Sequence, residues 1–407
     1  MIKIDNTTAT ISSSQLQSAT EACRSVLANK QLGFWQLPQR PQLIADSIRA
    51  AQRLRENGDR LLLFGIGGSS LGPRFLADLY SHSPQQIGIC DNADPLYLER
   101  IWGRAEDWKR GSFVFISKSG NTIETLASLQ RFHEYVRAVD ASWWKRALVI
   151  SEPKDNPLTQ WAKEKQVPVL EFPVDVGGRF SVLTPVGLMV ASFMGKKAEE
   201  FMQGAAWSLQ HEKLAAELVA QSLASFERKE WITMFWTYSS LFQHFGDWMV
   251  QLWAESLAKK ETVNGEPAPR VSTPVAAIGA TDQHSIIQQV MEGARDKWVV
   301  IHRVAELASC GPLGKDLLIP SLKPLQNQTL GRLLQAEAQA TAQALAHQGV
   351  SVLELTVQDT SPSSVGALLM LWQWVVAGLG ASLRINAFDQ PGVELGKRLA
   401  LKILSGQ

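Results

Sequence analysis

A run of small hydroxyl residues directly follows a strongly apolar segment in the first third of the chain. Residues 117–125 read Ser-Lys-Ser-Gly-Asn-Thr-Ile-Glu-Thr, after the apolar run 113–116. The pattern predicts a buried strand, a turn and then a helix. Free backbone N–H groups and the positive end of the helix dipole gather at such a helix start, and Ser117, Ser119 and Thr122 add hydroxyl donors. This combination suits a phosphate monoester, although an ordinary helix cap with spare serines has the same letters.

A glycine-rich segment follows another apolar run. Residues 65–72 read Gly-Ile-Gly-Gly-Ser-Ser-Leu-Gly, and glycines let a backbone approach a ligand closely. A dinucleotide fingerprint needs a third glycine where Ser70 stands and an acidic residue about 20 positions further on. Asp91 lies too far downstream for that. A dinucleotide site is therefore disfavoured, which leaves a loop that contacts a sugar or phosphate, or a bare tight turn.

Two further segments contain side chains suited to proton transfer. Arg179 follows two glycines, and an Arg there can stabilise an oxyanion or a planar enediolate, or be a surface side chain after a turn. Gln251 and Glu255 are four residues apart on one face of a predicted helix dense in Trp and Leu. A carboxylate beside large apolar groups loses hydration, which suits a general base. The alternative is a solvated charge that pairs with Lys259.

His284 and Lys397 are weaker candidates on their own. His284 lies in Thr-Asp-Gln-His-Ser, 281–285, at a predicted helix start, where a histidine can be an acid, a base, a cap or a surface residue. Lys397, in a predicted C-terminal helix, would alone be an ordinary surface lysine. The sequence has no His or Cys cluster with the spacing of metal ligands. We therefore expect no metal site.

Composition excludes several classes of protein. The formal net charge is +1 over 407 residues, which gives no basic face for nucleic acid and no acidic tail. The three cysteines, Cys23, Cys90 and Cys310, are far apart, as is typical of a reducing compartment. The first residues contain no signal-peptide apolar region. These features predict a cytoplasmic protein.

One segment has the length and apolarity of a membrane span. Residues 365–383 contain no charged side chain, but they include Gln373 and several glycines. The segment also lies between a predicted strand and a polar loop. We expect a helix buried against a sheet and no membrane association.

Short apolar runs alternate with helix-length segments through most of the chain, which predicts an α/β fold with parallel sheets. Ligands bind outside the carboxyl ends of such strands, so the turns 65–72 and 117–122 should face the same crevice. The first group of predicted strands covers 60–64, 86–90, 112–117, 146–151 and 167–172. The second group covers 231–236, 274–279, 298–303 and 351–355.

The same alternation divides the chain into two successive α/β domains. We predict a helical N-terminal segment over 1–45, domains over 46–205 and 206–380, and a C-terminal loop and helix over 381–407. A long helical region covers 184–226. The Gly-, Pro- and Leu-rich stretch 306–328 is predicted to be a loop.

Six segments, in order along nearly the whole chain, resemble the glucose-6-phosphate isomerase family. Together they are far more specific than any one of them. They are the two glycine- and serine-rich loops, 65–73 and 117–125, the arginine segment 176–183, the glutamate segment 253–259, the histidine segment 281–285 and the C-terminal signature 388–397.

The resemblance implies two sugar-isomerase (SIS) αβα-sandwich domains in a homodimer that interconverts glucose 6-phosphate and fructose 6-phosphate without a metal or organic cofactor. It implies that Glu255 moves a proton between C2 and C1 through a cis-enediol, and that Arg179 stabilises the negative charge. His284, from the neighbouring subunit, and Lys397 would help to open the sugar ring. The implied substrate-binding residues are Gly68, Ser69, Ser117, Lys118, Ser119, Thr122, Gln251 and Gln390.

The chain departs from the family pattern at two positions. Ala258 stands where the family usually has Gly, and Asn121 where it often has Thr. Neither change removes a proposed proton-transfer group. Two alternatives stay open at this point: an isomerase that also acts on mannose 6-phosphate, and a non-catalytic sugar-phosphate sensor built from SIS domains.

Overall fold

The first of two five-stranded sheets confirms the predicted parallel βαβ alternation. The computed structural model describes residues 1–83, 85–307 and 310–406. The sheet has the strand order β3-β2-β4-β5-β6, and every pair is parallel. Its strands are β2 (Leu61–Phe64), β3 (Ile87–Cys90), β4 (Ser112–Ile116), β5 (Ala147–Ser151) and β6 (Val169–Glu171).

The second sheet has the order β1-β10-β9-β7-β8 and is parallel except for β1, which pairs antiparallel with β10. The prediction of helices and loops over 1–45 was wrong for Ile2–Thr7, which form β1. This edge strand is mostly polar and pairs with residues about 350 positions away, so no local pattern reveals its partner. The strands are β1 (Ile2–Thr7), β7 (Ile232–Tyr238), β8 (Thr273–Ile278), β9 (Lys297–Val304) and β10 (Ser351–Val357).

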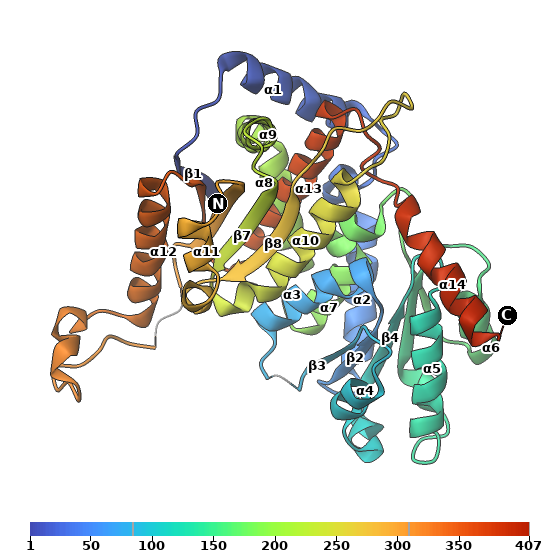
Figure 1. Ribbon diagram of the computed structural model, residues 1–407. Coiled ribbons are helices and arrows are strands. Elements are labelled where there is room, and N and C mark those ends of the chain that lie inside the picture. The colour runs from blue at the N-terminus through green and yellow to red at the C-terminus, as the bar shows by residue number, and fades with distance from the viewer. Residues whose placement is uncertain (84, 308–309, 407) are drawn as a thin grey trace.

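Helices cover the two sheets and join them (Figure 1). In the first part of the chain they are α1 (Ser13–Ala28), α2 (Pro41–Arg55), α3 (Leu71–Tyr80), α4 (Pro95–Trp102), α5 (Ile123–Val136) and α6 (Pro157–Lys165). The predicted helical region 184–226 is three helices, α7 (Pro185–Phe193), α8 (Ala198–Leu209) and α9 (Glu212–Glu227). They are followed by α10 (Gln243–Leu257), α11 (Ile287–Glu292), α12 (Leu330–His347), α13 (Pro362–Ser382) and α14 (Glu394–Leu404).

Short 3-10 helices occupy several of the connections. Those that matter for the site are η2 (Gly67–Ser69), η5 (Gly178–Leu183) and η7 (Thr281–His284). The predicted loop 306–328 contains only η8 (Pro320–Leu325), and its residues 308–309 lie outside the described residues. The others are η1 (Phe34–Gln39), η3 (Ala105–Arg110), η4 (Trp143–Arg146), η6 (Ser240–Phe242) and η9 (Pro391–Val393).

Helix α13 is the apolar segment that resembles a membrane span. It is long and apolar enough by composition, but 94% of its most apolar window is buried inside the protein. It packs mainly against α8, α1 and α9. The prediction of a buried helix is confirmed, because the burial is that of a core helix.

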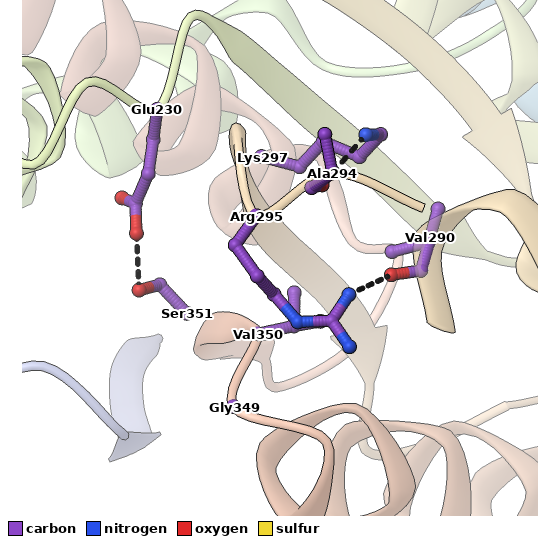
Figure 2. A pocket seen from close by; sticks show the side chains of 8 residues that line it. All are labelled: Glu230, Val290, Ala294, Arg295, Lys297, Gly349, Val350 and Ser351. Carbon is purple, nitrogen blue, oxygen red and sulfur yellow. Dashed lines mark hydrogen bonds between the residues drawn. The ribbon is translucent and has the colours of Figure 1, made fainter. Parts of the chain in front are cut away.

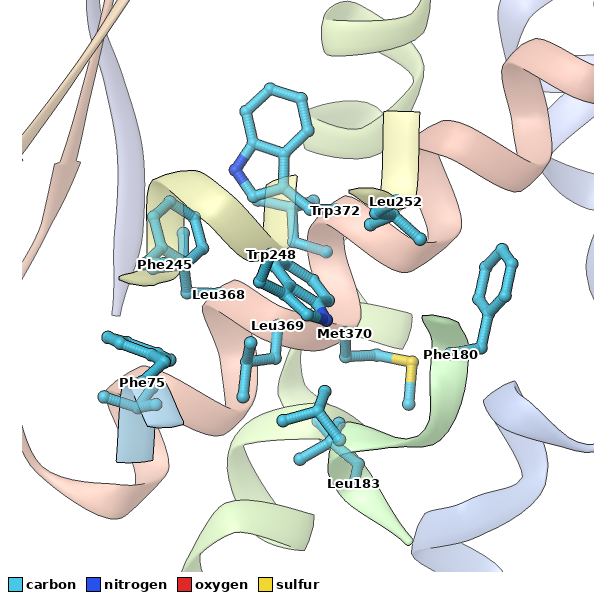
Figure 3. Close-up of a cluster of buried hydrophobic side chains, with 14 of the residues drawn as sticks. Phe75, Phe180, Leu183, Phe245, Trp248, Leu252, Leu368, Leu369, Met370 and Trp372 are labelled. Atoms are coloured by element: carbon cyan, nitrogen blue, oxygen red, sulfur yellow. The ribbon is translucent and has the colours of Figure 1, made fainter. Parts of the chain in front are cut away.

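We call the sheet β3-β2-β4-β5-β6 with its helices the first α/β unit, and the sheet β1-β10-β9-β7-β8 with its helices the second. One apolar cluster joins the two units (Figure 3). Phe75 of α3 and Leu183 of η5 come from the first unit, while Trp248 of α10 and Trp372 of α13 come from the second. These side chains are almost fully buried. The cluster therefore fixes η5 against α10, which matters because η5 holds Arg179 and α10 holds Glu255. The exact domain boundaries stay a prediction.

Candidate active site

The two predicted ligand loops lie side by side at the carboxyl ends of β2 and β4, which are neighbours in the first sheet. The chain runs from β2 outward to β3 on one side, and from β4 through β5 to β6 on the other. The strand order therefore reverses between β2 and β4, and ligands of open α/β sheets bind at such a switch point.

The turn 117–122 leaves the start of α5 without a side-chain cap. Thr122 occupies the N-cap position, but no side chain among the described residues makes the capping bond there. Its hydroxyl pairs instead with Ser117 Oγ at 2.8 Å, and the backbone N–H of Gly120 donates to Ser117 Oγ at 3.0 Å. Ser119 is exposed beside them. The interpretation of this turn as an ordinary helix cap is therefore wrong. Because the first turn of α5 is uncapped, its free N–H groups make it electropositive.

Lys118 points away from this turn. Its ammonium donates to the backbone oxygen of Val176 at 2.9 Å and lies 3.5 Å from Glu152 Oε1. The side chain thus ties the turn to the segment that precedes Arg179, and only the backbone of Lys118 remains for a ligand in the turn.

The glycine-rich loop 65–72 lies between the turn and the arginine segment. A Cβ on Gly68 would be 2.1 Å from the backbone oxygen of Gly178, and Ser181 Oγ donates to the Gly68 oxygen at 3.2 Å. Ser69 is buried beside these glycines. Only glycine permits this close approach of two backbones. Asp91, the acidic residue downstream of this loop, is held in an ion pair by Arg74.

Arg179 is a buried cation, 2% exposed, and not the surface side chain weighed as an alternative. Its Nε donates to Ser256 Oγ at 2.7 Å, and its Nη1 donates to Gln390 Oε1 at 2.7 Å. Its Nη2 donates to the backbone oxygens of Ala387 and Asp389. Burial lowers the pKa of the guanidinium, an effect that the nearby Glu255 carboxylate opposes. The C-terminal loop therefore packs directly on this arginine.

The Glu255 carboxylate faces Arg179 and Gln251. Its Oε2 lies 3.4 Å from Arg179 Nη1, and its Oε1 accepts from Gln251 Nε2 at 3.1 Å. Its side chain is 29% exposed, so part of it remains open to a ligand. The ammonium of Lys259 donates to the backbone oxygen of Glu255 at 2.8 Å and pairs with Asp389. The alternative, a solvated Glu255 carboxylate paired with Lys259, is therefore wrong, because Lys259 contacts Glu255 only at its backbone oxygen and pairs with Asp389.

Sequence reasoning missed two partners in this group. Ser256 accepts from Arg179, and Asp389 pairs with Lys259. A single buried serine next to a glutamate carries no signal in the sequence. Asp389 lay inside the C-terminal signature, where only Gln390 and Lys397 were singled out.

His284 lies far from Glu255 within one chain. It is exposed on η7, beyond the carboxyl end of β8. Near Glu255, Trp253 Nε1 donates to Ser272 Oγ at 3.2 Å, just before β8 begins. The six residues of β8 rise about 20 Å in total. Glu255, on the helix that contacts the amino end of β8, and His284, beyond its carboxyl end, therefore lie towards opposite ends of that strand. Lys397 is exposed on α14, which begins shortly after Gln390.

A separate small pocket lies at the amino ends of the second sheet (Figure 2). Its wall includes Glu230, whose carboxylate accepts from Ser351 Oγ and pairs with Arg228. Lys297 pairs there with Asp296. Glu230 and Lys297 are thus held in ion pairs, and Arg295 donates to backbone oxygens within residues 290–293. We therefore interpret the pocket as structural. Across the residues that the structure describes, no three His, Cys, Asp or Glu side chains are grouped to hold a metal ion.

Known proteins resemble this chain over most of its length. The family model of phosphoglucose isomerase matches residues 48–306 and 329–407. A glucose-6-phosphate isomerase of Thermus thermophilus is 35% identical over 406 residues, covering 95% of this chain and 94% of that protein. The glucose-6-phosphate isomerase of Rubrobacter xylanophilus is 34% identical, covering 90% of this chain and 88% of that protein.

Two solved structures share the fold. A Thermus thermophilus protein described as hypothetical matches with a TM-score of 0.88 and 30% identity over the whole of both chains. A glucose-6-phosphate isomerase of Chlamydia trachomatis matches with a TM-score of 0.75 and 24% identity, covering 89% of this chain and 73% of that one. Because the family match spans most of the sequence and relatives exceed 30% identity over nearly all of it, the chain belongs to the phosphoglucose isomerase family.

Proposed function

We propose that Glu255 is the base that moves a proton between C1 and C2 of a phosphohexose held by the turn 117–122. The chain is an isomerase that interconverts glucose 6-phosphate and fructose 6-phosphate. The observation that carries the proposal is the contact of Glu255 with a buried arginine and with Gln251. A sensor needs no such base, so the sensor alternative is not favoured.

The reaction needs one carboxylate that reaches both carbons of a planar enediol, and a cation that lowers the cost of its negative charge. Arg179 Nη1 is 3.4 Å from the Glu255 carboxylate, so both can approach the same atoms of a ligand. The uncapped start of α5 and the hydroxyls of Ser117 and Thr122 suit the phosphate. Gly68 and Ser69, between the turn and Arg179, are proposed to contact the sugar. An anchored phosphate would orient the rest of the sugar for proton transfer.

Ring opening is proposed to use Lys397 together with His284 of a second subunit. Within one chain, His284 lies beyond the carboxyl end of β8, while the part of α10 that carries Glu255 contacts the residue before β8 through Trp253. The strand between them is about 20 Å long, which is longer than one hexose. A two-fold dimer in which η7 approaches the partner's Arg179 would bring both groups to one sugar. The protein is therefore proposed to be a homodimer with two shared sites.

Subunit mixing tests this arrangement. Glu255→Gln and His284→Ala are each expected to reduce the activity of the homodimer to a small, measurable remainder. If the histidine comes from the partner, a hybrid dimer keeps one intact site, and random reassortment of equal amounts restores about a quarter of wild-type activity. If both groups act within one subunit, no hybrid has an intact site and mixing restores nothing. Mixing without subunit exchange is the matched control.

We also infer a cytoplasmic location, as the sequence predicts. All three cysteines are free, with Cys23 and Cys90 buried and Cys310 exposed. Unpaired, widely spaced thiols suit a reducing compartment. A fluorescent fusion of the whole chain, observed in its native cell, would check the location.

A further inference from the structure

The turn that presents His284 is anchored through the residue before it. In η7 the side chain of Gln283 turns inward, while the histidine is exposed. Gln283 Nε2 donates to Tyr238 Oη at 2.6 Å and to Thr341 Oγ1 at 2.5 Å. One amide group thus connects η7 to the end of β7 and to α12.

Both partners of this amide are rigidly placed. Tyr238 is 2% exposed and Thr341 is 5% exposed. The ring of Tyr238 also packs on the backbone at Gly279, where a Cβ would lie 2.4 Å from the ring carbons. The Tyr238 side chain therefore supports η7 twice, through its ring against the preceding backbone and through its hydroxyl to Gln283.

A second bond fixes the other side of the turn. Asp282 Oδ2 accepts the backbone N–H of Ile278 at 2.7 Å, and Asp282 Oδ1 accepts from Ser285 Oγ. The bond from Ile278 holds η7 to the end of β8, the bond from Ser285 is local to the turn, and neither reaches β7 or α12. The Gln283 amide supplies the link to those two elements, and a 3-10 turn of four residues has little stability of its own.

We propose that Gln283 is a positioning residue that sets where the His284 imidazole lies. The inference rests on the proposed role of His284 in ring opening. Adjacent Cα atoms are about 3.8 Å apart, so a shift of Gln283 moves the histidine with it. A general acid or base must come within hydrogen-bond reach of the proton it transfers, and a misplacement of about 1 Å slows such a step considerably.

A double-mutant cycle tests the coupling. Gln283→Ala is expected to lower kcat about tenfold to a hundredfold with little change in KM, because the phosphate turn is untouched. The same change added to His284→Ala is expected to cost nothing further, because the residue it positions is already gone. A purely structural role would lower activity by the same factor in both backgrounds.

Two variants at Thr341 keep the inference testable if Gln283→Ala does not fold. Thr341→Val removes one acceptor of the amide and is expected to lower kcat severalfold, whereas Thr341→Ser keeps the hydroxyl and should keep wild-type kcat. Wild-type kcat in both Gln283→Ala and Thr341→Val would overturn the inference about Gln283 but leave the proposed role of His284 intact. Wild-type kcat in His284→Ala would overturn the proposed role of the histidine, and the inference with it.

Discussion

The two α/β units use the ends of their sheets for different purposes. In the first unit the carboxyl ends of β2 and β4 lead into turns of glycine and small hydroxyl residues, which offer mainly backbone donors. In the second unit the end of α10 that carries Glu255 contacts the residue before β8 through Trp253, and His284 lies beyond the carboxyl end of β8. The first unit thus holds the proposed anion-binding turns, while the second holds the proposed base Glu255 and His284.

This separation has a kinetic consequence. Contacts with the phosphate act equally on the bound substrate and on the transition state, so their loss raises KM more than it lowers kcat. Contacts made only as charge develops at the enediolate act on kcat. Variants in the two regions should therefore fall into two kinetic classes.

The largest effect is expected for Glu255→Gln. The change keeps the size of the side chain but removes the base, so kcat should fall about a thousandfold while phosphosugar affinity stays within a few-fold of wild type. Turnover assays and calorimetric titration with fructose 6-phosphate measure the two quantities. Glu261→Gln, at an exposed position nearby, is the matched control and should be silent. Wild-type turnover in Glu255→Gln would show that Glu255 is not the base.

A smaller effect on kcat is expected for Arg179→Lys. Lysine keeps the charge, but three donors on a flexible stem cannot serve the acceptors that fix this guanidinium. We expect kcat to fall about a hundredfold and the melting temperature to fall as well, because buried acceptors lose their donors. Arg24→Lys, on an exposed ion pair, is the control. A change confined to KM would place Arg179 in the binding class instead.

The turn 117–122, the proposed phosphate site, should show the opposite kinetic pattern. Thr122→Val removes the hydroxyl that pairs with Ser117 but keeps the side-chain shape. A hydrogen bond to an anion is worth about 1.5 kcal/mol, so KM should rise about tenfold with kcat nearly unchanged. Thr125→Val in the same helix turn removes a buried hydroxyl with no hydrogen-bond partner among the described residues, so it should leave KM unchanged. Equal KM values in Thr122→Val and wild type would contradict a phosphate site at this turn.

The sequence was most informative where one local pattern determines one local structure. The parallel strands of both sheets were predicted because continuous apolar runs of Val, Ile, Leu and Phe suit strands that are covered on both faces. The helix after Ser117 and the buried helix over 365–383 followed from equally local signals. Strand β1 was missed because its pairing with β10 joins the two ends of the chain.

The contacts within the site could not be predicted from spacing alone. Gln251 and Glu255 lie on one helix, so their contact follows from helical geometry. Arg179 meets Ser256 and the loop before α14 only because the core between α10 and η5 brings distant segments together. The separation of His284 from Glu255 likewise depends on the direction of α10 relative to β8, which single residues do not reveal.

The second unit also contains a histidine with no part in the proposed chemistry, and its effect should appear in stability and not in turnover. His302 is 3% exposed, accepts a hydrogen bond from Trp372 Nε1 at 3.1 Å, and burial lowers its pKa to about 3. The unfolded chain binds a proton at this side chain below about pH 6.5, while the folded chain stays neutral there until about pH 3. The free energy of unfolding should therefore fall by up to about 1.4 kcal/mol for each pH unit as the pH drops through this window.

His302→Phe should remove this part of the pH dependence. The apolar ring suits neighbours such as Phe235 and Phe245, and the lost acceptor for Trp372 is a cost that does not vary with pH. Urea unfolding at several pH values between 4 and 7 measures the slope, and His284→Asn is the exposed control that should keep it. Equal slopes in His302→Phe and wild type would show that acid sensitivity arises elsewhere, whereas a flatter slope with unchanged kcat at neutral pH would separate the buried histidine of this unit from the exposed one.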